Sequence, residues 1–236
     1  MIDGATKLVA LLGHPVAGSL SPRMHNAAFA ARALDWAYVP LDVEPGRLEA
    51  AVEGLVAGGY AGANVTIPHK LAVAALCDEA EGESVNTLVF RDSRIVGFNT
   101  DKEIVAGIEA RTVCLLGSGG AAHALLPALP GEVRVFSRSG AWPPDASGCD
   151  LIVNATPVRD ELLVEPRREH AVVDLAYNAD GSPTSLVEAA RAAGCREIVD
   201  GLEALVRQGA ASFRLWTGVE APVEVMRTAL GLGDGA

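Results

Sequence analysis

Short apolar runs recur along the whole chain. The first run, residues 8–12, is bounded by Gly13 and Pro15 and predicts a buried strand. Pro40 interrupts the second run, so its strand is expected at a sheet edge. Together the runs predict strands at residues 8–12, 38–43, 62–67, 84–90, 94–97, 112–116, 133–136, 150–154 and 171–175, with the fourth and fifth forming a hairpin.

Helical patterns separate most of these runs. Ser21 followed by Pro22 is typical of a helix cap with proline at the first helical position. Pro68 ends a strand and is expected to open another helix. Helices are predicted at residues 23–34, 45–58, 68–77, 185–193, 202–216 and 222–230, and from the glycine segment at 117 to about residue 129. Alternation of this kind indicates an α/β fold.

The pattern changes character near residue 99 and predicts two domains. Beyond that point strands and helices alternate without a hairpin, which is typical of a doubly wound parallel sheet. We expect an α/β substrate-binding domain made of residues 1–99 and 203–236, whose C-terminal helices pack back on it. Residues 100–202 are expected to form the doubly wound domain.

Composition narrows the class of protein. The net charge of −11 over 236 residues argues against nucleic-acid and anionic-membrane binding, which need clustered positive charge. The four cysteines lack the spacing of metal or redox motifs and favour a reducing compartment. No signal-peptide pattern and no apolar run of membrane-spanning length is present. We therefore expect a cytoplasmic protein.

The segment after the 112–116 strand has the pattern Gly-x-Gly-x-x-Ala. Glycines permit a tight turn and close approach to a pyrophosphate, whose charge the following helix stabilises. The pattern predicts a Rossmann-like dinucleotide site, although a purely structural turn is the alternative. The expected contact residues are Gly117, Ser118, Gly119, Gly120, Ala121 and Ala122.

Ser137, Arg138 and Ser139 follow the next strand, starting 20 residues after Gly117. An acidic residue, which would bind the ribose 2′-hydroxyl of NAD, is absent from these positions. A guanidinium between two hydroxyls suits a 2′-phosphate instead. NADP is therefore favoured over NAD, unless Arg138 is an ordinary surface residue.

Lysine is scarce in this chain, with three lysines against 16 arginines, and one of the three is Lys70. An ammonium can release its proton when its surroundings shift its pKa, whereas a guanidinium stays charged. Lys70 is therefore a candidate for proton transfer, with Asp101 available to orient it. Chance placement in a loop is the alternative. No cluster with metal-ligand spacing accompanies these residues.

Polar motifs lie in order along nearly the whole chain and resemble those of the shikimate dehydrogenase family. They include Ser19-Leu-Ser21-Pro, Asn64-Val-Thr-Ile-Pro-His-Lys70 and Asn99-Thr-Asp101. The matching segments are residues 13–26, 64–70, 85–87, 97–101, 117–122, 154–157, 174–177 and 201–218.

The resemblance implies reversible NADPH-dependent reduction of 3-dehydroshikimate to shikimate, a step toward chorismate and the aromatic amino acids. It implies Lys70 and Asp101 as the catalytic pair. Substrate contacts are implied for Ser19 and Ser21 at the carboxylate, for Thr66 and Asn86 at ring hydroxyls, and for Tyr177 and Gln208 in the same pocket. Asn154 and Thr156 are implied beside the cofactor, in a monomer or homodimer.

The chain departs from the family pattern at several positions. Lys102 stands where the family has glycine, and Val158-Arg159 replaces Gly-Met. The segment from Asp101 to Thr112 is short, so the linking helix is expected to be trimmed. Two alternatives stay open: an NAD-preferring quinate/shikimate dehydrogenase and a non-catalytic NADP-binding paralogue of the same fold.

Overall fold

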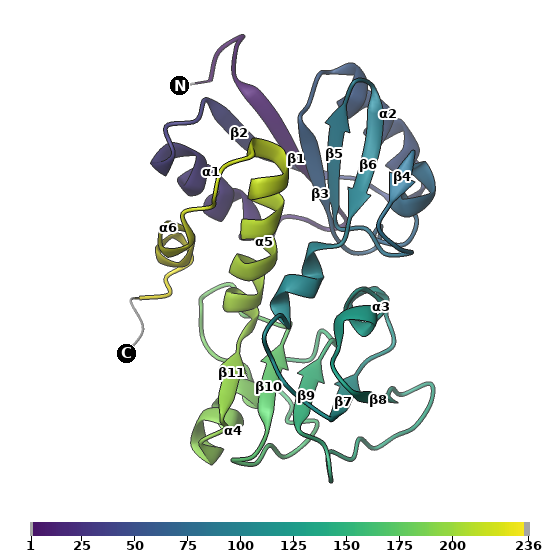
Figure 1. The fold of residues 1–236 in the computed structure, drawn as a ribbon, viewed down its shortest axis with the longest axis vertical. Helices are drawn as coiled ribbons and strands as arrows, with labels where there is room; N and C mark the ends of the chain where they lie inside the picture. The colour runs from purple at the N-terminus through teal and green to yellow at the C-terminus, as the bar shows by residue number, and fades with distance from the viewer. Residues whose placement is uncertain (1, 234–236) are drawn as a thin grey trace. The chain divides into compact units, whose positions relative to one another are not determined.

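A computed structural model describes residues 2–233 of the chain, which divides into two compact units (Figure 1). Unit 1 comprises Met1–Thr100 and Val206–Ala236, and unit 2 comprises Asp101–Leu205. The chain therefore passes between the units twice, once after Thr100 and once before Val206.

Unit 1 is built on a mixed six-stranded sheet with the order β2-β1-β3-β5-β6-β4. The strands β2, β1 and β3 run parallel, while β3, β5 and β6 pair antiparallel. The predicted hairpin and the predicted edge position of the Pro40 strand are confirmed. The bounds are β1 Lys7–Gly13, β2 Trp36–Asp42, β3 Gly62–Val65, β4 Glu79–Ala80, β5 Thr87–Arg91 and β6 Arg94–Phe98.

Helices cover both faces of this sheet because successive residues of a strand point to opposite sides. Ala10 and Leu12 of β1 pack in one apolar cluster with α2. A second group contains Phe29 of α1, stacked on Phe213 of α5 with ring centroids 5.3 Å apart. The helical bounds are α1 Ser21–Ala31, η1 Pro45–Arg47, α2 Leu48–Ala57, η2 Val73–Leu76, α5 Gly201–Thr217 and α6 Val223–Ala229.

Two local predictions in unit 1 were wrong. The helix expected at residues 68–77 is a series of turns ending in the 3₁₀ helix η2, because the buried His69 ring hydrogen-bonds the Val43 carbonyl (2.7 Å) and holds the segment there. Ser21 is the first residue of α1 rather than its cap, which is Leu20.

Unit 2 contains a five-stranded parallel sheet with the order β11-β10-β9-β7-β8, in agreement with the predicted doubly wound class. Strands β9 and β10 are buried at every residue, which explains why the first three residues of each are apolar. The sequence patterns missed β11. The bounds are β7 Thr112–Leu116, β8 Glu132–Phe136, β9 Leu151–Asn154, β10 Ala171–Asp174 and β11 Glu197–Val199.

Unit 2 has few helices for a doubly wound fold. They are η3 Thr100–Ile104, which begins in unit 1, α3 Gly120–Leu125, η4 Leu126–Ala128 and α4 Ser185–Ala193, with the start of α5. The link after Asp101 is thus reduced to a 3₁₀ helix, as predicted. The connections at residues 137–150 and 155–170 contain no helix.

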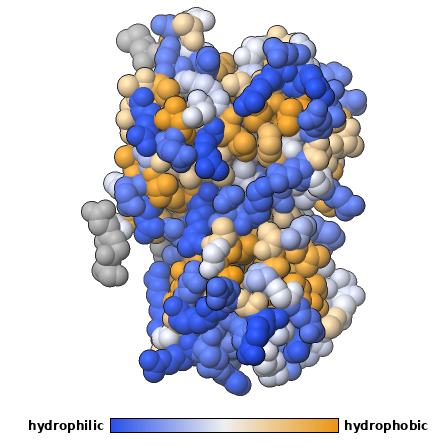
Figure 2. Space-filling view, in the orientation of Figure 1, coloured by the Kyte–Doolittle hydropathy of each residue, from blue (hydrophilic) through white to orange (hydrophobic). Residues whose placement is uncertain are grey.

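The helix-free connections change how the second sheet is covered. On one face, α4 is joined by Leu162, Leu163 and Val164 from the 155–170 loop, which pack against the apolar cluster there. Edge strand β8 is less well covered, and its Val135 is 42% exposed. Figure 2 shows apolar surface on unit 2 in this view. Within residues 2–233, each helix is too short or too polar to cross a bilayer.

Candidate functional site

The glycine turn of unit 2 lies between β7 and α3. Gly117 adopts a left-handed φ of 106°, and a Cβ there would lie 3.1 Å from the Ala155 carbonyl oxygen. Glycine is therefore required for this turn to pack against the loop after β9. Around Gly119 and Gly120 an added Cβ would meet nothing within 4 Å, so the space beside the start of α3 is open.

Arg138 is exposed just beyond β8, between two serines whose hydroxyls are 3.2 Å apart. Its guanidinium lies over the Trp142 ring, 5.8 Å from the centroid, and 3.7 Å from a carboxylate oxygen of Glu161. Both partners of this ion pair are largely exposed, so the pair is worth less than about 1 kcal/mol and a phosphate dianion can displace it. Sequence reasoning missed Glu161, which the 155–170 loop brings to Arg138.

Asn154 and Thr156 form a tight loop after β9. The Asn154 amide oxygen accepts hydrogen bonds from the Thr156 backbone N–H (3.0 Å) and hydroxyl (2.7 Å). Its amide nitrogen donates to the Val158 carbonyl and to the Asp174 carboxylate (2.9 Å). Both ends of the Asn154 side chain are therefore used to hold the loop rather than to face solvent.

Asp174 is a fully buried acid at the end of β10. Its carboxylate accepts hydrogen bonds from Asn154, from the Ala176 backbone N–H (3.0 Å) and from the Thr184 hydroxyl. Burial raises the pKa of Asp174, and these three donors oppose that rise. The acid ties the loop after β9 to the start of α4, where Thr184 is the N-cap. In the sequence, the signal for Asp174 was an acidic residue directly after the apolar residues 171–173.

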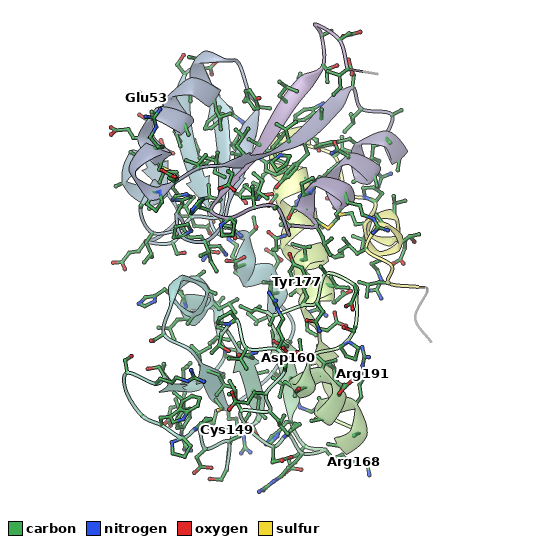
Figure 3. All side chains as sticks on the ribbon, turned by 180° about the vertical axis from the view of Figure 1, so that it is seen from behind. Glu53, Cys149, Asp160, Arg168, Tyr177 and Arg191 are labelled. Carbon is green, nitrogen blue, oxygen red and sulfur yellow. The ribbon has the colours of Figure 1, made fainter. Side chains whose placement is uncertain are left out.

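Tyr177 follows β10 and is half-buried. Figure 3 shows it at the opposite end of unit 2 from Cys149, which precedes β9. Tyr177 thus lies beyond the carboxyl ends of the parallel strands, the end at which such sheets bind ligands. Gly201 allows the close approach of α5 there, since a Cβ on it would lie 2.3 Å from the Ala176 carbonyl oxygen.

Ser19 and Ser21 meet at the start of α1 in unit 1. The Ser21 backbone N–H donates to the Ser19 hydroxyl oxygen (3.3 Å). Thr66, just after β3, packs so closely on the end of β1 that a Cβ at Gly13 would lie 2.4 Å from its methyl group. Hydroxyls at the ends of β1 and β3 and at the start of α1 are suited to bind an oxygen-rich small molecule.

Two asparagines of unit 1, Asn64 and Asn86, are part of a buried network. The Asn64 amide oxygen accepts from the Tyr38 hydroxyl (2.9 Å), and its nitrogen donates to the Asn86 carbonyl (3.1 Å) and the Thr87 hydroxyl (3.0 Å). The Asn86 amide oxygen accepts from the Thr100 backbone N–H (2.8 Å) and hydroxyl (3.1 Å). The oxygen side of Asn86 is therefore held inside the protein, which directs its NH₂ group the other way.

Lys70 and Asp101 are each linked to Asn86 through a neighbouring residue. The Lys70 carbonyl accepts from the backbone N–H of Val85, the residue before Asn86 (2.9 Å). Thr100, the residue before Asp101, donates to the Asn86 side chain. Lys70 is half-buried and Asp101 is 6% exposed. The two residues belong to different units, so the pairing of their side chains stays a prediction.

The remaining predicted residue of unit 1 is Gln208, half-buried on α5. Unit 1 thus carries Ser19, Ser21, Thr66, Lys70, Asn86 and Gln208, while unit 2 carries Asp101, Tyr177 and the residues expected at the cofactor. Among residues 2–233 no group of three or more His, Cys, Asp or Glu side chains is arranged to hold a metal ion.

Sequence reasoning gave no role to His25, whose ring is fully buried in unit 1. The ring stacks on Tyr38 with centroids 4.6 Å apart, and neither ring nitrogen has a hydrogen-bond partner. Burial lowers the pKa of His25 to about 3. The ring is therefore neutral at working pH and acts as an aromatic core residue.

Two protein-family patterns match this chain. The pattern described as the shikimate dehydrogenase substrate binding domain matches residues 11–88. The pattern described as the shikimate 5′-dehydrogenase C-terminal domain matches residues 201–230. Both matches fall mainly in unit 1.

Individual relatives cover nearly the whole chain. The shikimate dehydrogenase (NADP(+)) of Rubrobacter xylanophilus is 41% identical over 286 aligned positions, which include 99% of this chain and 98% of the relative. Since this chain has 236 residues, at least 50 of those positions have no counterpart in it. This shortness accompanies the helix-free connections of unit 2.

Solved structures of similar fold include enzymes with either cofactor. Shikimate 5-dehydrogenase from Thermus thermophilus, in complex with NADP(H) and shikimate, has a TM-score of 0.82 and 30% identity, covering 96% of this chain and 99% of that chain. Quinate dehydrogenase from Corynebacterium glutamicum, in complex with NAD, has a TM-score of 0.77 and 25% identity, covering 95% and 98% respectively.

Proposed function

Because this chain belongs to the shikimate dehydrogenase family, we propose that it catalyses the reversible NADPH-dependent reduction of 3-dehydroshikimate to shikimate. The observation that carries the proposal is the connection of Lys70, Asn86 and Thr100–Asp101 through hydrogen bonds around one strand end. The carbonyl of Lys70, the proposed acid, accepts a hydrogen bond from Val85, the residue before Asn86. The backbone N–H of Thr100, the residue before Asp101, donates to the Asn86 side chain.

The substrate-binding residues are proposed from their chemistry and from the family motifs. Ser19 and Ser21 bind the carboxylate, because two neighbouring hydroxyls at one helix start can both donate to it. Thr66 and Asn86 hold ring hydroxyls, and the Thr100 backbone N–H and hydroxyl fix the orientation of the Asn86 amide through its oxygen. Tyr177 and Gln208 are proposed as further substrate contacts.

Lys70 is proposed to deliver the proton of the reduction. Bound NADPH supplies a hydride to the carbonyl carbon of the substrate. The Lys70 ammonium stabilises the negative charge that develops on the carbonyl oxygen and transfers a proton to it. Asp101 orients the ammonium, and in the oxidative direction Lys70 accepts the same proton back.

The residues of unit 2 fit a dinucleotide. The open space beside Gly119 and Gly120 admits a pyrophosphate, and the Asn154–Thr156 loop packs directly on Gly117. Ser137, Arg138 and Ser139 are proposed to bind the 2′-phosphate of NADP. The remaining proposed contacts are Ser118, Ala121 and Ala122.

A second candidate is an NAD-preferring quinate/shikimate dehydrogenase. Glu161 favours it, because this carboxylate lies 3.7 Å from the Arg138 guanidinium and repels a 2′-phosphate. The hydroxyls on both sides of Arg138 favour NADP. We propose NADP as the main cofactor, in a cytoplasmic monomer or homodimer.

The test follows the absorbance of reduced nicotinamide with shikimate and with quinate, each supplied with NADP and with NAD. Shikimate with NADP is expected to give the highest kcat/KM. Preference for quinate and NAD would select the second candidate. Absence of turnover in every combination, with the cofactor still bound, would favour a non-catalytic binding protein.

Lys70→Ala tests the catalytic assignment. It is expected to lower kcat by about 10²-fold or more, the usual contribution of a general acid, with a smaller change in KM. Lys7→Ala is the matched control, because Lys7 is an exposed lysine that lies over the Trp36 ring. A kcat for Lys70→Ala within a few-fold of the wild type would refute the role given to Lys70.

A further inference from the structure

Three buried hydroxyl groups meet in unit 1. Thr87 lies on β5, Thr100 at the start of η3 and Ser212 on α5, and each is at most 2% exposed. The Ser212 oxygen is 2.8 Å from the Thr87 oxygen and 3.1 Å from the Thr100 oxygen, and the two threonine oxygens are 3.4 Å apart. We call Thr87, Thr100 and Ser212 the hydroxyl cluster.

Each member of the hydroxyl cluster adjoins a residue of the proposed site. Thr87 follows Asn86 and Thr100 precedes Asp101 in the sequence. Ser212 lies one helical turn after Gln208 on α5, and its single O–H is within hydrogen-bond distance of the Gln208 carbonyl (3.1 Å) and of the two threonine oxygens. The hydroxyl cluster therefore lies beside three residues of the proposed site, Asn86, Asp101 and Gln208, which come from distant parts of the chain.

The hydroxyl cluster also joins the two segments by which the chain passes between the units. Thr100 is the last residue of unit 1 before the first passage, and α5 forms the second passage. The Ser212 oxygen lies 3.1 Å from the Thr100 oxygen and 2.8 Å from the Thr87 oxygen, so the Ser212 hydroxyl joins the two segments to each other and to β5. Loss of the cluster would leave each segment attached to unit 1 by fewer contacts.

The hydrogen bonds of the cluster have a direction that matters for the site. The Thr87 hydroxyl donates to the Asn86 amide oxygen (3.0 Å), which also accepts from Thr100. The Asn64 amide nitrogen donates to the oxygens of Thr87 (3.0 Å) and Ser212 (3.1 Å). Thr87 therefore accepts a hydrogen bond from Asn64 and donates one to Asn86, which fixes both amides in one orientation.

We propose that the hydroxyl cluster positions the reacting groups: Thr87, Thr100 and Ser212 hold the Asn86 amide, the backbone of Asp101 and the Gln208 turn of α5 in place for substrate. The proposal rests on the proposed function, since it assigns a role to residues behind that site. None of the three hydroxyls is proposed to touch the substrate. They are positioning residues, acting through their neighbours.

Thr87 offers a matched pair of variants that separates hydrogen bonding from packing. Thr87→Val keeps the side-chain volume and removes the hydroxyl, whereas Thr87→Ser keeps the hydroxyl and removes a methyl group. Thr87→Val is expected to lower kcat/KM for shikimate about tenfold or more, as one lost positioning interaction does. Thr87→Ser is expected to stay within about threefold, although its loss of buried methyl contacts lowers the melting temperature.

Two outcomes would overturn the proposal. Equal losses of kcat/KM in Thr87→Val and Thr87→Ser would mean that packing alone matters at this position. Values within about twofold of the wild type for both variants, measured well below their melting temperatures, would mean that the hydroxyl is idle. Ser84→Ala is the control, because Ser84 is a buried serine whose hydroxyl has no hydrogen-bond partner and lies outside the cluster.

A second measurement does not depend on activity. The Thr100 backbone N–H donates to Asn86, so its hydrogen exchange reports on the cluster. In Ser212→Ala this amide is expected to exchange about tenfold faster than in the wild type, while Ser84→Ala leaves it unchanged. Unchanged exchange in Ser212→Ala would refute the cluster itself. A wild type without dehydrogenase activity but with faster exchange in Ser212→Ala would instead refute the proposed function and leave the cluster standing.

Discussion

His25 makes the stability of unit 1 sensitive to acid. Its ring is fully buried, both ring nitrogens lack hydrogen-bond partners, and burial lowers its pKa from 6.5 to about 3. The folded protein therefore favours the neutral ring more strongly than the unfolded chain does. The resulting stability is fully present above pH 6.5 and is lost as the pH falls toward the folded pKa.

The size of the effect follows from the two pKa values. Each pH unit below the unfolded pKa costs 1.36 kcal/mol until the folded pKa is reached, so lowering the pH to about 4.5 removes about 2.7 kcal/mol. His25→Phe keeps an aromatic ring against Tyr38 and removes the titrating group. Between neutral pH and about pH 4.5, the variant is expected to lose about 2.7 kcal/mol less free energy of unfolding than the wild type.

Denaturant unfolding of both proteins at the two pH values measures this difference, and other titrating groups cancel in the comparison. Phe29→Leu is the control, since Phe29 is a buried neighbour of His25 without a charge. It is expected to lower stability by a similar amount at both pH values. Parallel pH profiles for the wild type and His25→Phe would refute the reasoning.

Two further predictions concern close packing and a buried acid. Gly62→Ala is expected to lower the free energy of unfolding by about 3 kcal/mol, because its Cβ would lie 2.2 Å from the Leu88 carbonyl oxygen and 2.5 Å from Trp216 Nε1. Gly54→Ala, in open space on α2, should be neutral or stabilising in the same unfolding experiment, and equal losses would contradict the packing argument. Asp174→Ala leaves three buried donors unpaired and is expected to cost about 3–5 kcal/mol, measured by urea unfolding. A loss below about 1 kcal/mol would show that the network relaxes.

Local pattern was enough to predict most strands and the class of the fold. The apolar run at 112–116 coincides with β7, and the predicted helix at 185–193 coincides with α4. Both predictions are correct because a buried strand needs a continuous apolar run, and a helix with one buried face needs apolar residues every three or four positions. The glycine turn and the order of the family motifs could also be found without coordinates, since turn conformation depends on the residues of the turn itself.

Tertiary contacts decided the features that have no local period. The segment at 68–77 forms turns because His69 is held by Val43, far back in the chain. Thr87, Thr100 and Ser212 meet because the strands and α5 bring together hydroxyls more than 100 positions apart. The sequence around each of these three residues does not indicate the other two, because a hydrogen bond between distant residues depends on how whole elements pack. The sequence thus determined which elements form and which residues are suited to the chemistry, and the packing of those elements decided which side chains hold them in place.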